Sequence, residues 1–558
     1  MQVKINNKKV KCKEGETILE VLQKQGIKVP TLCYHPDLKP EGRCRICLVE
    51  ADGKLVTSCD TKIKDGMDII TNSKKVLDAR KLNTELIASH HLKLCPTELE
   101  KNELCEIIAD LGLSESRFKE LSRKEPDTSN TCLVIDPNKC ILCGRCVQAC
   151  QKVQKFFAIE FVNRGIFTKV TPAFELPLGK VACTYCGQCS LVCPVGAIKE
   201  KDDTLAVIKA LKDKKKHVVV QIAPSIRASI GEEFNMPPGS LVTGKIVAAL
   251  RKVGFDKIFD TDLGADMTIM EEASEFVERL KKNGPFPMIT TCCPAWIKFM
   301  EHHEHELFPN MSSCKSPHMM LGILTKTYYA KKQNIPKKDI KVVSVMPCTA
   351  KKFESLRPEL RGNVDYVLTT REAARLINYF NLDLKKLPDE DFDPTLGIST
   401  GAGVMFGASG GVMEAALRTA YEFATNNSIQ KLEFDEIRGM EGIKEGTIKI
   451  NNRNIRFAVA HSGKNIRELL EKKEKYHFIE MMACPGGCIG GGGQPLITTK
   501  EILKKRMKAI YQQDAKLPLR KSHENPVVKA IYKEFLGKPL SKKAHKLLHT
   551  KYTKRDMF

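Results

Sequence analysis

Residues 140–150 read CILCGRCVQAC, and residues 183–194 repeat the pattern as CTYCGQCSLVCP. In both runs the cysteines are spaced C-x2-C-x2-C-x3-C, a spacing in which the fourth cysteine of each run ligates the cluster of the other run. The repeat therefore predicts a small domain with two interlocked [4Fe-4S] clusters. One cluster is expected on Cys140, Cys143, Cys146 and Cys193, and the other on Cys183, Cys186, Cys189 and Cys150. A pair of zinc sites is the alternative, but zinc does not require the third spacing.

The cysteine content of the whole chain also favours metal clusters over disulfides. The 558 residues include 22 cysteines, many of them in tight groups. Disulfide frameworks belong to short secreted chains, whereas residues 1–10 contain no apolar signal segment and no stretch approaches about 18 consecutive apolar residues. We therefore expect a cytoplasmic protein of several domains that does not enter a membrane.

The formal charge of +23 indicates a polyanionic partner, either nucleic acid or an acidic protein. No zinc-finger, helix-turn-helix or RNA-binding signature is present, and the lysines are spread along the chain rather than gathered in one arm. Trp296 is the one tryptophan. We expect no nucleic acid as a partner, and we expect a basic face that docks an acidic electron carrier.

Residues 1–76 contain short strand-like runs separated by turns, a helical stretch from Thr17 to Gln25, and a hairpin turn at Asp52 and Gly53. The segment resembles the β-grasp fold of plant-type ferredoxins. Its cysteines are spaced C-x10-C-x2-C-x11-C, and the resemblance assigns them to a [2Fe-2S] cluster. These residues are Cys33, Cys44, Cys47 and Cys59. Zinc is the alternative metal for this set.

Residues 77–125 are interpreted as a charged helical insert. His91, Cys95 and Cys105 resemble the H-x3-C-x2-C-x5-C pattern with which multidomain hydrogenases and NADH dehydrogenase subunits bind a further [4Fe-4S] cluster. The chain departs from that pattern, because Glu98 replaces the middle cysteine and Cys105 lies one residue late. A carboxylate is a harder iron ligand than a thiolate, so an altered cluster and no cluster at all both remain open.

Residues 126–205 enclose the cysteine repeat, and residues 206–558 form the largest domain. An apolar run from His217 to Ile222 opens alternating strand-like and helix-like segments that continue to about residue 499, which predicts an α/β domain. Residues 501–558 are helical and basic, and we expect a solvated arm without chemistry.

The glycine-rich stretch GAGVMFGASGG at residues 401–411 is a candidate nucleotide site. Its glycines depart by one residue from the dinucleotide fingerprint, and no acidic partner stands at the expected distance. We expect a close-packed loop lining the active site rather than an NAD site.

Three further motifs belong to no simple ferredoxin: TTCCPAW at 290–296, MPCTAKKFE at 346–354 and EMMACPGGCIGGGGQP at 480–495. Together they resemble the signature of [FeFe]-hydrogenases, and the resemblance covers essentially the whole chain. It implies an H-cluster, in which a [4Fe-4S] cubane is bound by Cys293, Cys348, Cys484 and Cys488. Cys488 would bridge the cubane to a diiron subsite carrying CO, cyanide and a bridging dithiolate, and dedicated maturation proteins would assemble it.

The same resemblance assigns residues around the subsite. Lys351 and Ser225 match the donors to the two cyanides, which need donors because a charged ligand in a buried pocket is costly when unpaired. Met346 and Met482 match methionines that pack against the subsite. Taken alone, the lysine would be read as a surface residue and the methionines as core filling.

Proton transfer is assigned to a second group of residues. Cys292 matches the family's proton donor beside the vacant coordination site, and the matching relay continues through Glu272, Ser312 and Glu275. The two glutamates are three residues apart, on one face of a helix. A solvated acidic helix face is the alternative. Cys314 has no role in the family's pattern.

The sequence thus predicts a multidomain α/β and α+β enzyme with a β-grasp [2Fe-2S] domain, a two-[4Fe-4S] ferredoxin domain and a large α/β H-cluster domain. It would interconvert protons and H2 with electrons from reduced ferredoxin or flavodoxin. One rival is a non-catalytic relative that senses H2 or redox state, or assembles iron-sulfur clusters, on the same scaffold. An electron-transfer subunit of an NADH-dependent complex is another, but it would leave the three later motifs unexplained.

Overall fold

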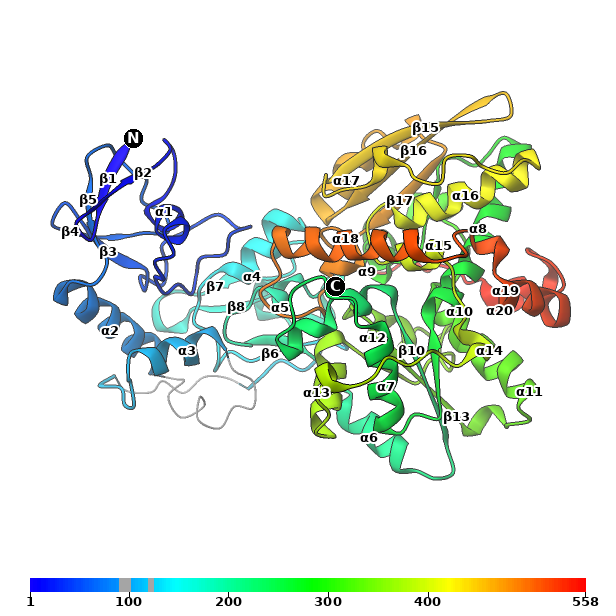
Figure 1. Cartoon of the computed structure of the whole chain (residues 1–558), viewed down its shortest axis with the longest axis horizontal. Coiled ribbons are helices and arrows are strands. Elements are labelled where there is room, and N and C mark those ends of the chain that lie inside the picture. The colour runs from blue at the N-terminus through cyan, green and yellow to red at the C-terminus, as the bar shows by residue number, and fades with distance from the viewer. Residues whose placement is uncertain (90–101, 119–124, 558) are drawn as a thin grey trace.

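The computed structural model describes residues 1–89, 102–118 and 125–557, and the molecule is elongated (Figure 1). A five-stranded N-terminal sheet lies at one end, the segment with the cysteine repeat follows, and two four-stranded sheets with their many helices occupy the other end. The cluster motifs therefore follow one another in space in the order in which they follow one another in the sequence. The architecture is multidomain α/β and α+β, as predicted.

The N-terminal sheet has the strand order β2-β1-β5-β3-β4. Its strands are β1 (Gln2–Ile5), β2 (Lys8–Lys11), β3 (Leu48–Ala51), β4 (Lys54–Thr57) and β5 (Asp68–Ile70). Asp52 and Gly53 both have positive φ, as a tight two-residue hairpin turn requires, and they join β3 to β4. Helix α1 (Ile18–Lys24) begins at a capping box formed by Thr17 and Glu20. The predicted hairpin and helix are confirmed.

Two helices follow the sheet, α2 (Lys74–Ala88) and α3 (Glu103–Asp110), and they pack against each other. Asn102 caps α3 by accepting the backbone N–H of Cys105 at 3.0 Å. His91, Cys95 and Glu98, the residues predicted to form or alter the additional cluster, lie outside the described residues.

The cysteine repeat is also a repeat of backbone conformation. Helices α4 (Arg145–Gln148) and α5 (Gln188–Leu191) each begin after a glycine in the left-handed region, Gly144 with φ 84° and Gly187 with φ 70°. Each glycine directly follows the second cysteine of its run, where a side chain would strain the turn. The strands of this segment are β6 (Leu133–Ile135) paired with β9 (Ile198–Glu200), and β7 (Glu160–Val162) paired with β8 (Lys169–Thr171).

The large domain contains two four-stranded sheets, which confirms the predicted α/β class. The first is entirely parallel, in the order β11 (Lys257–Asp260), β10 (His217–Ile222), β13 (Ile340–Val345) and β14 (Tyr366–Leu368). The second has the order β12 (Met288–Ile289), β17 (Phe478–Met482), β16 (Arg453–His461) and β15 (Ile443–Ile450), with only β15 antiparallel to its neighbour. Strand β10 is buried along almost its whole length, as expected of a parallel strand covered by helices on both faces.

Helices cover and connect the two sheets. The longest, α8 (Thr261–Lys282), packs against α10 (Pro317–Leu324) on one side and α16 (Gly411–Thr425) on the other. The other helices of the region are α6 (Thr204–Lys212), α7 (Thr243–Val253), α9 (Pro294–His303), α11 (Ala330–Lys332), α12 (Ala350–Leu356), α13 (Thr370–Tyr379), α14 (Pro394–Gly397), α15 (Gly401–Met405) and α17 (Gly463–Leu470).

One residue or more of each cavity motif follows the carboxyl end of a parallel strand. Ser225 comes after β10, Cys292 after β12, Cys348 after β13 and Cys484 after β17. Parallel strands have their carboxyl ends at one edge of a sheet, which is where α/β proteins place their sites. Four distant segments of the chain are thereby brought to one place between the two sheets.

The glycine-rich stretch is closely packed, but it is not only a loop, because it contains α15. A Cβ atom on Gly403 would lie 2.6 Å from the Asp262 backbone oxygen, and one on Gly411 would lie 1.8 Å from the Met405 oxygen. These glycines allow backbone segments to approach one another more closely than any side chain would permit.

The C-terminal segment is helical as predicted, with α18 (Lys500–Lys516), α19 (Pro526–Ile531) and α20 (Lys542–Leu548). The expectation of a solvated arm is wrong. Arg506 and Asp514 are fully buried and form ion pairs with Glu232 and Arg418, and the apolar residues of α19 and α20 belong to the main core. The many basic residues of this segment concealed an amphipathic pattern, whose apolar side must pack against the domain surface. No helix in the described part of the chain is both long and apolar enough to cross a membrane.

Candidate active site

Four cysteines of the three late motifs converge. Burial raises the pKa of the Cys484 thiol, and the neighbouring Cys348, Cys293 and Cys488 raise it further. Such a set of crowded, buried sulfurs cannot ionise together without a cation among them. The backbone N–H of Ala483 donates to Cys293 Sγ at 3.4 Å, the kind of amide-to-sulfur bond that supports cluster thiolates. The donor set therefore fits an iron-sulfur cubane.

A cavity with an empty volume of about 440 Å³ lies beside these cysteines. Its lining is mostly apolar, with two cluster cysteines, one further thiol and one ammonium group. The lining includes Cys292, Cys348, Cys488, Met346, Phe406 and Lys351. A mostly apolar chamber with one buried cation suits a subsite that carries anionic cyanide ligands, because the cation can pair with their negative charge.

Lys351 is held at the cavity by two hydrogen bonds. Its Nζ donates to the Cys292 backbone oxygen at 2.9 Å and to Glu354 Oε2 at 2.8 Å. Burial disfavours the ammonium, but the Glu354 carboxylate outweighs this effect, so the pKa of Lys351 is raised. The lysine is thus a fixed cation at neutral pH.

Glu354 also accepts a hydrogen bond from His318 Nε2 at 2.7 Å. Burial and the charge of Lys351 lower the pKa of His318 to about 4, so the imidazole is neutral near pH 7. Sequence reasoning missed both residues. The spacing of three residues between Lys351 and Glu354 on α12 was a usable signal, whereas nothing in the sequence pointed to His318.

The other predicted cofactor-binding residues lie around the cavity. Met346 lines it, and Met482 packs in the same apolar cluster as Cys292 and Cys488. Ser225 is fully buried one residue beyond the lining residue Pro224, and its Oγ accepts a bond from Gln494 Nε2 at 3.3 Å. The structure therefore brings all three to the chamber or directly behind its wall.

The predicted proton-transfer residues form a row leading away from the cavity. Cys292 lines the chamber, and burial, followed by Cys488 and Cys293, raises the pKa of its thiol. Glu272 lies within electrostatic reach of Cys292 and is 1% exposed, so it is not part of a solvated helix face. Burial raises the pKa of Glu272 to about 8, with the Ser312 hydroxyl opposing the shift. Ser312 therefore lies within reach of Glu272, although neither carboxylate oxygen accepts a well-formed hydrogen bond within the described part of the chain.

The outer end of the row is polar and less buried. Ser312 Oγ accepts the backbone N–H of Cys314 at 3.2 Å. Glu275 Oε1 accepts from Arg279 at 2.6 Å, and its side chain is 16% exposed. The three groups thus run from a fully enclosed carboxyl to one near solvent.

The repeat cysteines fall into the two predicted groups. Burial raises the pKa of Cys146, and the thiols that raise it further are, in decreasing order, Cys143, Cys140, Cys193 and then Cys189 of the other group. Burial likewise raises the pKa of Cys189, whose nearest thiol neighbours are Cys186, Cys183 and Cys150. Each group therefore includes the fourth cysteine of the other run.

The N-terminal cysteines also lie together. Cys33 is linked by side-chain hydrogen bonds to Cys44 and Cys59, and the Cys59 bond lowers the pKa of Cys47 to about 7. Cys33 and Cys44 pack in one apolar cluster with Cys140, Cys143 and Cys193. The N-terminal set therefore adjoins the first group of repeat cysteines.

The second group of repeat cysteines adjoins the cavity. Thr349, next to Cys348, donates to the Tyr185 backbone oxygen at 2.7 Å, and Gln188 Nε2 donates to the Gly490 oxygen at 2.8 Å. A Cβ atom on Gly492 would lie 2.3 Å from the Cys186 oxygen. Glycine at this position lets the two cysteine groups approach, and Cys186 acts electrostatically on Cys484.

Comparison with protein families matches four segments of the chain. Residues 216–492 match "Iron only hydrogenase large subunit, C-terminal domain", and residues 500–555 match "Iron hydrogenase small subunit". Residues 1–74 match "2Fe-2S iron-sulfur cluster binding domain", and residues 139–197 match "4Fe-4S dicluster domain".

Similar proteins span the whole chain. It is 47% identical to the NADP-reducing hydrogenase subunit HndD of Solidesulfovibrio fructosivorans, covering 100% of this chain and 99% of the relative. It is 43% identical to iron hydrogenase 1 of Clostridium pasteurianum, covering 99% of each. A solved structure of apo [FeFe]-hydrogenase HydA1 from Chlamydomonas reinhardtii is 40% identical, with a TM-score of 0.58, over 64% of this chain and 100% of that one.

Proposed function

The chain belongs to the iron-only hydrogenase family, and from this premise we propose which residues hold its clusters and how they supply protons and electrons. It is an oxidoreductase that acts on H2 and contains an H-cluster, two [4Fe-4S] clusters and a [2Fe-2S] cluster. The observation that carries the proposal is the convergence of four cysteines beside an apolar cavity, which two of them line together with Cys292 and Lys351.

We assign the cubane to Cys293, Cys348, Cys484 and Cys488, which come from both sheets. When bound, the H-cluster supplies the metal centre at which protons and electrons combine to give H2. Lys351 is the donor to one cyanide because it is buried, cationic and held by Glu354. Ser225 is the donor to the second cyanide, and Met346 and Met482 exclude water from the subsite.

The proton path runs from Glu275 near the surface through Ser312 and Glu272 to Cys292. The surroundings of the row support this order, because Glu275 is partly exposed, Ser312 and Glu272 are buried, and Cys292 faces the cavity. A thiol at the cavity wall can give and accept a proton without a change in the backbone. Glu272 is suited to exchange because its pKa of about 8 lies near neutral pH.

The three accessory groups of cysteines would hold the clusters that supply electrons, in the order in which the groups pack against one another. The [2Fe-2S] cysteines adjoin the group of Cys140, and the group of Cys183 adjoins the cavity cysteines. We propose reduced ferredoxin or flavodoxin as the donor, because an acidic carrier suits a chain of charge +23. The rate of reduction by ferredoxin should then fall steeply between low and physiological salt. A rate insensitive to salt would contradict this partner.

A second candidate for the electron partner follows from the 47% identical relative, which is a subunit of an NADP-reducing hydrogenase. In that case partner subunits would pass electrons between NADP and the N-terminal domain. Co-purification from the native host distinguishes the two: a stable complex with NADP-dependent H2 turnover favours partner subunits, and an active single chain favours ferredoxin.

The experiment that tests the function as a whole uses protein matured with the assembly proteins that an H-cluster needs. We expect infrared bands of CO and cyanide together with H2 evolution from an artificial reductant. Bands without turnover would favour a non-catalytic relative that senses H2 or redox state. Non-catalytic relatives are a real alternative, because a cytosolic iron-sulfur assembly component of Mus musculus is 30% identical over 60% of this chain. We also propose a cytoplasmic location, which cell fractionation tests.

A further inference from the structure

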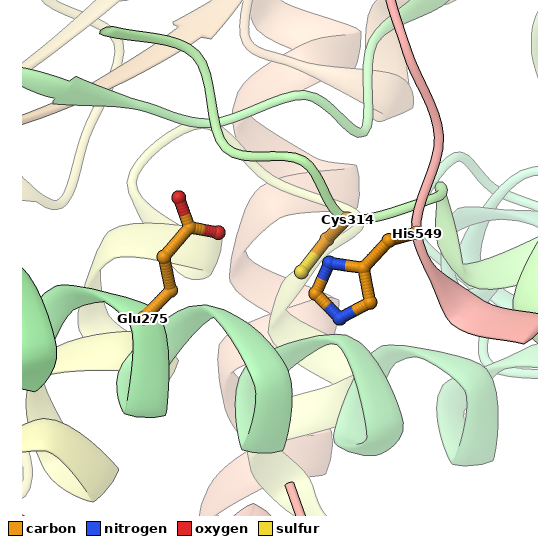
Figure 2. A group of neighbouring side chains, drawn as sticks. All are labelled: Glu275, Cys314 and His549. Carbon is orange, nitrogen blue, oxygen red and sulfur yellow. The ribbon is translucent and has the colours of Figure 1, made fainter. Parts of the chain in front are cut away.

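At the outer end of the proposed proton path, three chemically different metal-binding side chains meet. The carboxylate of Glu275, the thiol of Cys314 and the imidazole of His549 offer ligand atoms that all lie within 4.8 Å of one another (Figure 2). They come from α8, from the loop after β12 and α9, and from the segment directly after α20. A backbone bridge between Cys314 and His549 holds the last two segments together.

His549 is oriented by a second carboxylate. Its Nε2 lies 3.0 Å from Glu271 Oε2, and Glu271 is fixed by the Tyr532 hydroxyl at 2.5 Å and the Leu540 backbone N–H at 2.9 Å. With the Nε2 proton directed at Glu271, Nδ1 is left as an acceptor; it lies on the side of the ring toward Cys314 (Figure 2) and contacts the Ser313 hydroxyl, which a metal ion would displace. In metal sites a carboxylate commonly holds the outer nitrogen of a ligating histidine in this way.

Glu275 is supported similarly. Arg279 donates to its Oε1, while Oε2 lies 3.5 Å from the Ser313 hydroxyl, which in turn contacts His549 Nδ1 at 2.8 Å. Cys314 is 1% exposed and lies within electrostatic reach of Glu272, Glu275 and Glu271, so its surroundings attract a cation. No hydrogen bond in the described part of the chain uses its thiol as the donor.

We propose that Glu275, Cys314 and His549 form a binding site for one Zn²⁺ ion, with a fourth position open to solvent. Nitrogen, sulfur and oxygen ligands in one set suit zinc, and zinc binds such sets more tightly than ferrous iron does. Zinc–sulfur bonds of about 2.3 Å and zinc–nitrogen or –oxygen bonds of about 2.0 Å require the side chains to draw together by roughly 1 Å. Binding releases the thiol proton of Cys314 to solvent.

The site would regulate proton supply. Glu275 is the outer carboxylate of the proposed relay, so an effect of zinc on proton supply rests on the proposed function. A carboxylate bound to zinc cannot pass protons inward, so zinc should slow H2 turnover without touching the clusters. The zinc site would therefore be a reversible control on proton supply that leaves the clusters unchanged.

Metal binding to the matured full-length protein tests the site directly. After incubation with zinc chloride and gel filtration, we expect one zinc per chain and an unchanged iron content. Zinc-edge X-ray absorption should show a single sulfur ligand with nitrogen and oxygen ligands, and the irons do not interfere with this signal. Retention of no zinc, or a zinc with two or more sulfur ligands, would overturn the proposal.

Variants identify the ligands. Cys314→Ser and His549→Gln should abolish the bound zinc, and Glu271→Gln should weaken it by about 10- to 100-fold, the effect usual for the group that orients a metal-bound histidine. His545→Gln is the matched control, because its exposed ring stacks on His549 at 4.1 Å without joining the three ligands. Zinc binding that survives both ligand substitutions would refute the site.

Turnover separates the site from the relay. Zinc should inhibit H2 evolution by the wild-type protein, a chelator should restore it, and Cys314→Ser should evolve H2 normally with or without zinc. If zinc binds with one sulfur but does not inhibit, the site stands and the role of Glu275 in proton transfer fails.

Discussion

At the scale of single residues, the proposed cluster ligand Cys293 and the proposed proton donor Cys292 are adjacent in the chain. Cys293 heads α9 and accepts a backbone N–H from Ala483, whereas Cys292 faces the cavity beside Lys351. The two adjacent thiols therefore differ in surroundings, and substitution of each should have a different result.

Cys292→Ser should retain the clusters and lower turnover by about 10² or more, the usual scale for a positioned acid-base group. A serine hydroxyl does not exchange its proton near neutral pH as a tuned thiol does. Infrared spectra and H2 evolution with artificial reductant measure the two effects. Cys293→Ser is the contrast, because it should disturb assembly of the cluster itself. Near wild-type evolution by Cys292→Ser would refute the assigned relay.

Glu272→Gln should also lower turnover, because an amide cannot relay a proton as a carboxyl does. It should further change the pH dependence of stability. The folded protein raises the pKa of Glu272 from 4.5 to about 8, so between these values the folded state holds a proton that the unfolded state has lost. Stability therefore falls as pH rises through this window.

The glutamine variant lacks that fall, so its stability relative to wild type should increase from about pH 5 to about pH 8. Anaerobic thermal unfolding at the two values measures it. An equal difference between variant and wild type at both values would mean that Glu272 is ionised throughout.

At the scale of elements, glycine-rich segments decide how closely the cluster-bearing parts approach. The run from Gly490 to Gly493 lies against the second repeat loop, and Gln188 and Thr349 add hydrogen bonds across the contact. The helices and strands at this contact are short, so direct contact between backbone segments sets the distance between the two cysteine groups.

Gly492→Ala should separate these groups, because the new Cβ would lie 2.3 Å from the Cys186 oxygen. We expect CO and cyanide bands to remain, and turnover with a protein electron donor to fall by about 10-fold or more, since shifts of about 1 Å between reacting groups are costly. Gly231→Ala is the control, because its nearest neighbour is the flexible Met236 side chain at 3.3 Å. Equal turnover of the two variants would remove this contact from the electron path.

At the scale of the whole molecule, the cysteine groups extend from the N-terminal sheet at one end to the domain with the two four-stranded sheets at the other (Figure 1). The C-terminal helices close the large domain rather than leaving it, and they bring His549 to α8. The iron content per chain therefore depends on cluster binding in every domain.

Iron analysis of matured protein should give about 16 irons per chain, or about 20 if the region of Glu98 holds a cluster. Cys95→Ser decides between the two. A count near the lower figure that the substitution does not change would mean that His91, Cys95 and Cys105 bind no cluster. A loss of about four irons would show that they do.

The sequence by itself determined the local features. Cysteine spacing in a tight loop fixes which sulfurs can converge on a cluster, and the grouping of Cys146 with Cys193 followed from spacing alone. Alternating apolar runs likewise identified β10, the β3–β4 hairpin and the α/β class, because these patterns are periodic over a few residues. The ligand and relay assignments came from family resemblance and remain predictions.

Only the tertiary structure decided what depends on distant segments meeting. Burial of the C-terminal helices, the His318–Glu354–Lys351 chain and the group of Glu275, Cys314 and His549 each join residues far apart in the sequence. Residue type says that a histidine or a thiol can bind or titrate, but its neighbours and its solvation are set by the packing of the two sheets and α8. Those neighbours are the reason that we propose one acidic residue on α8 as a proton carrier and another as a zinc ligand.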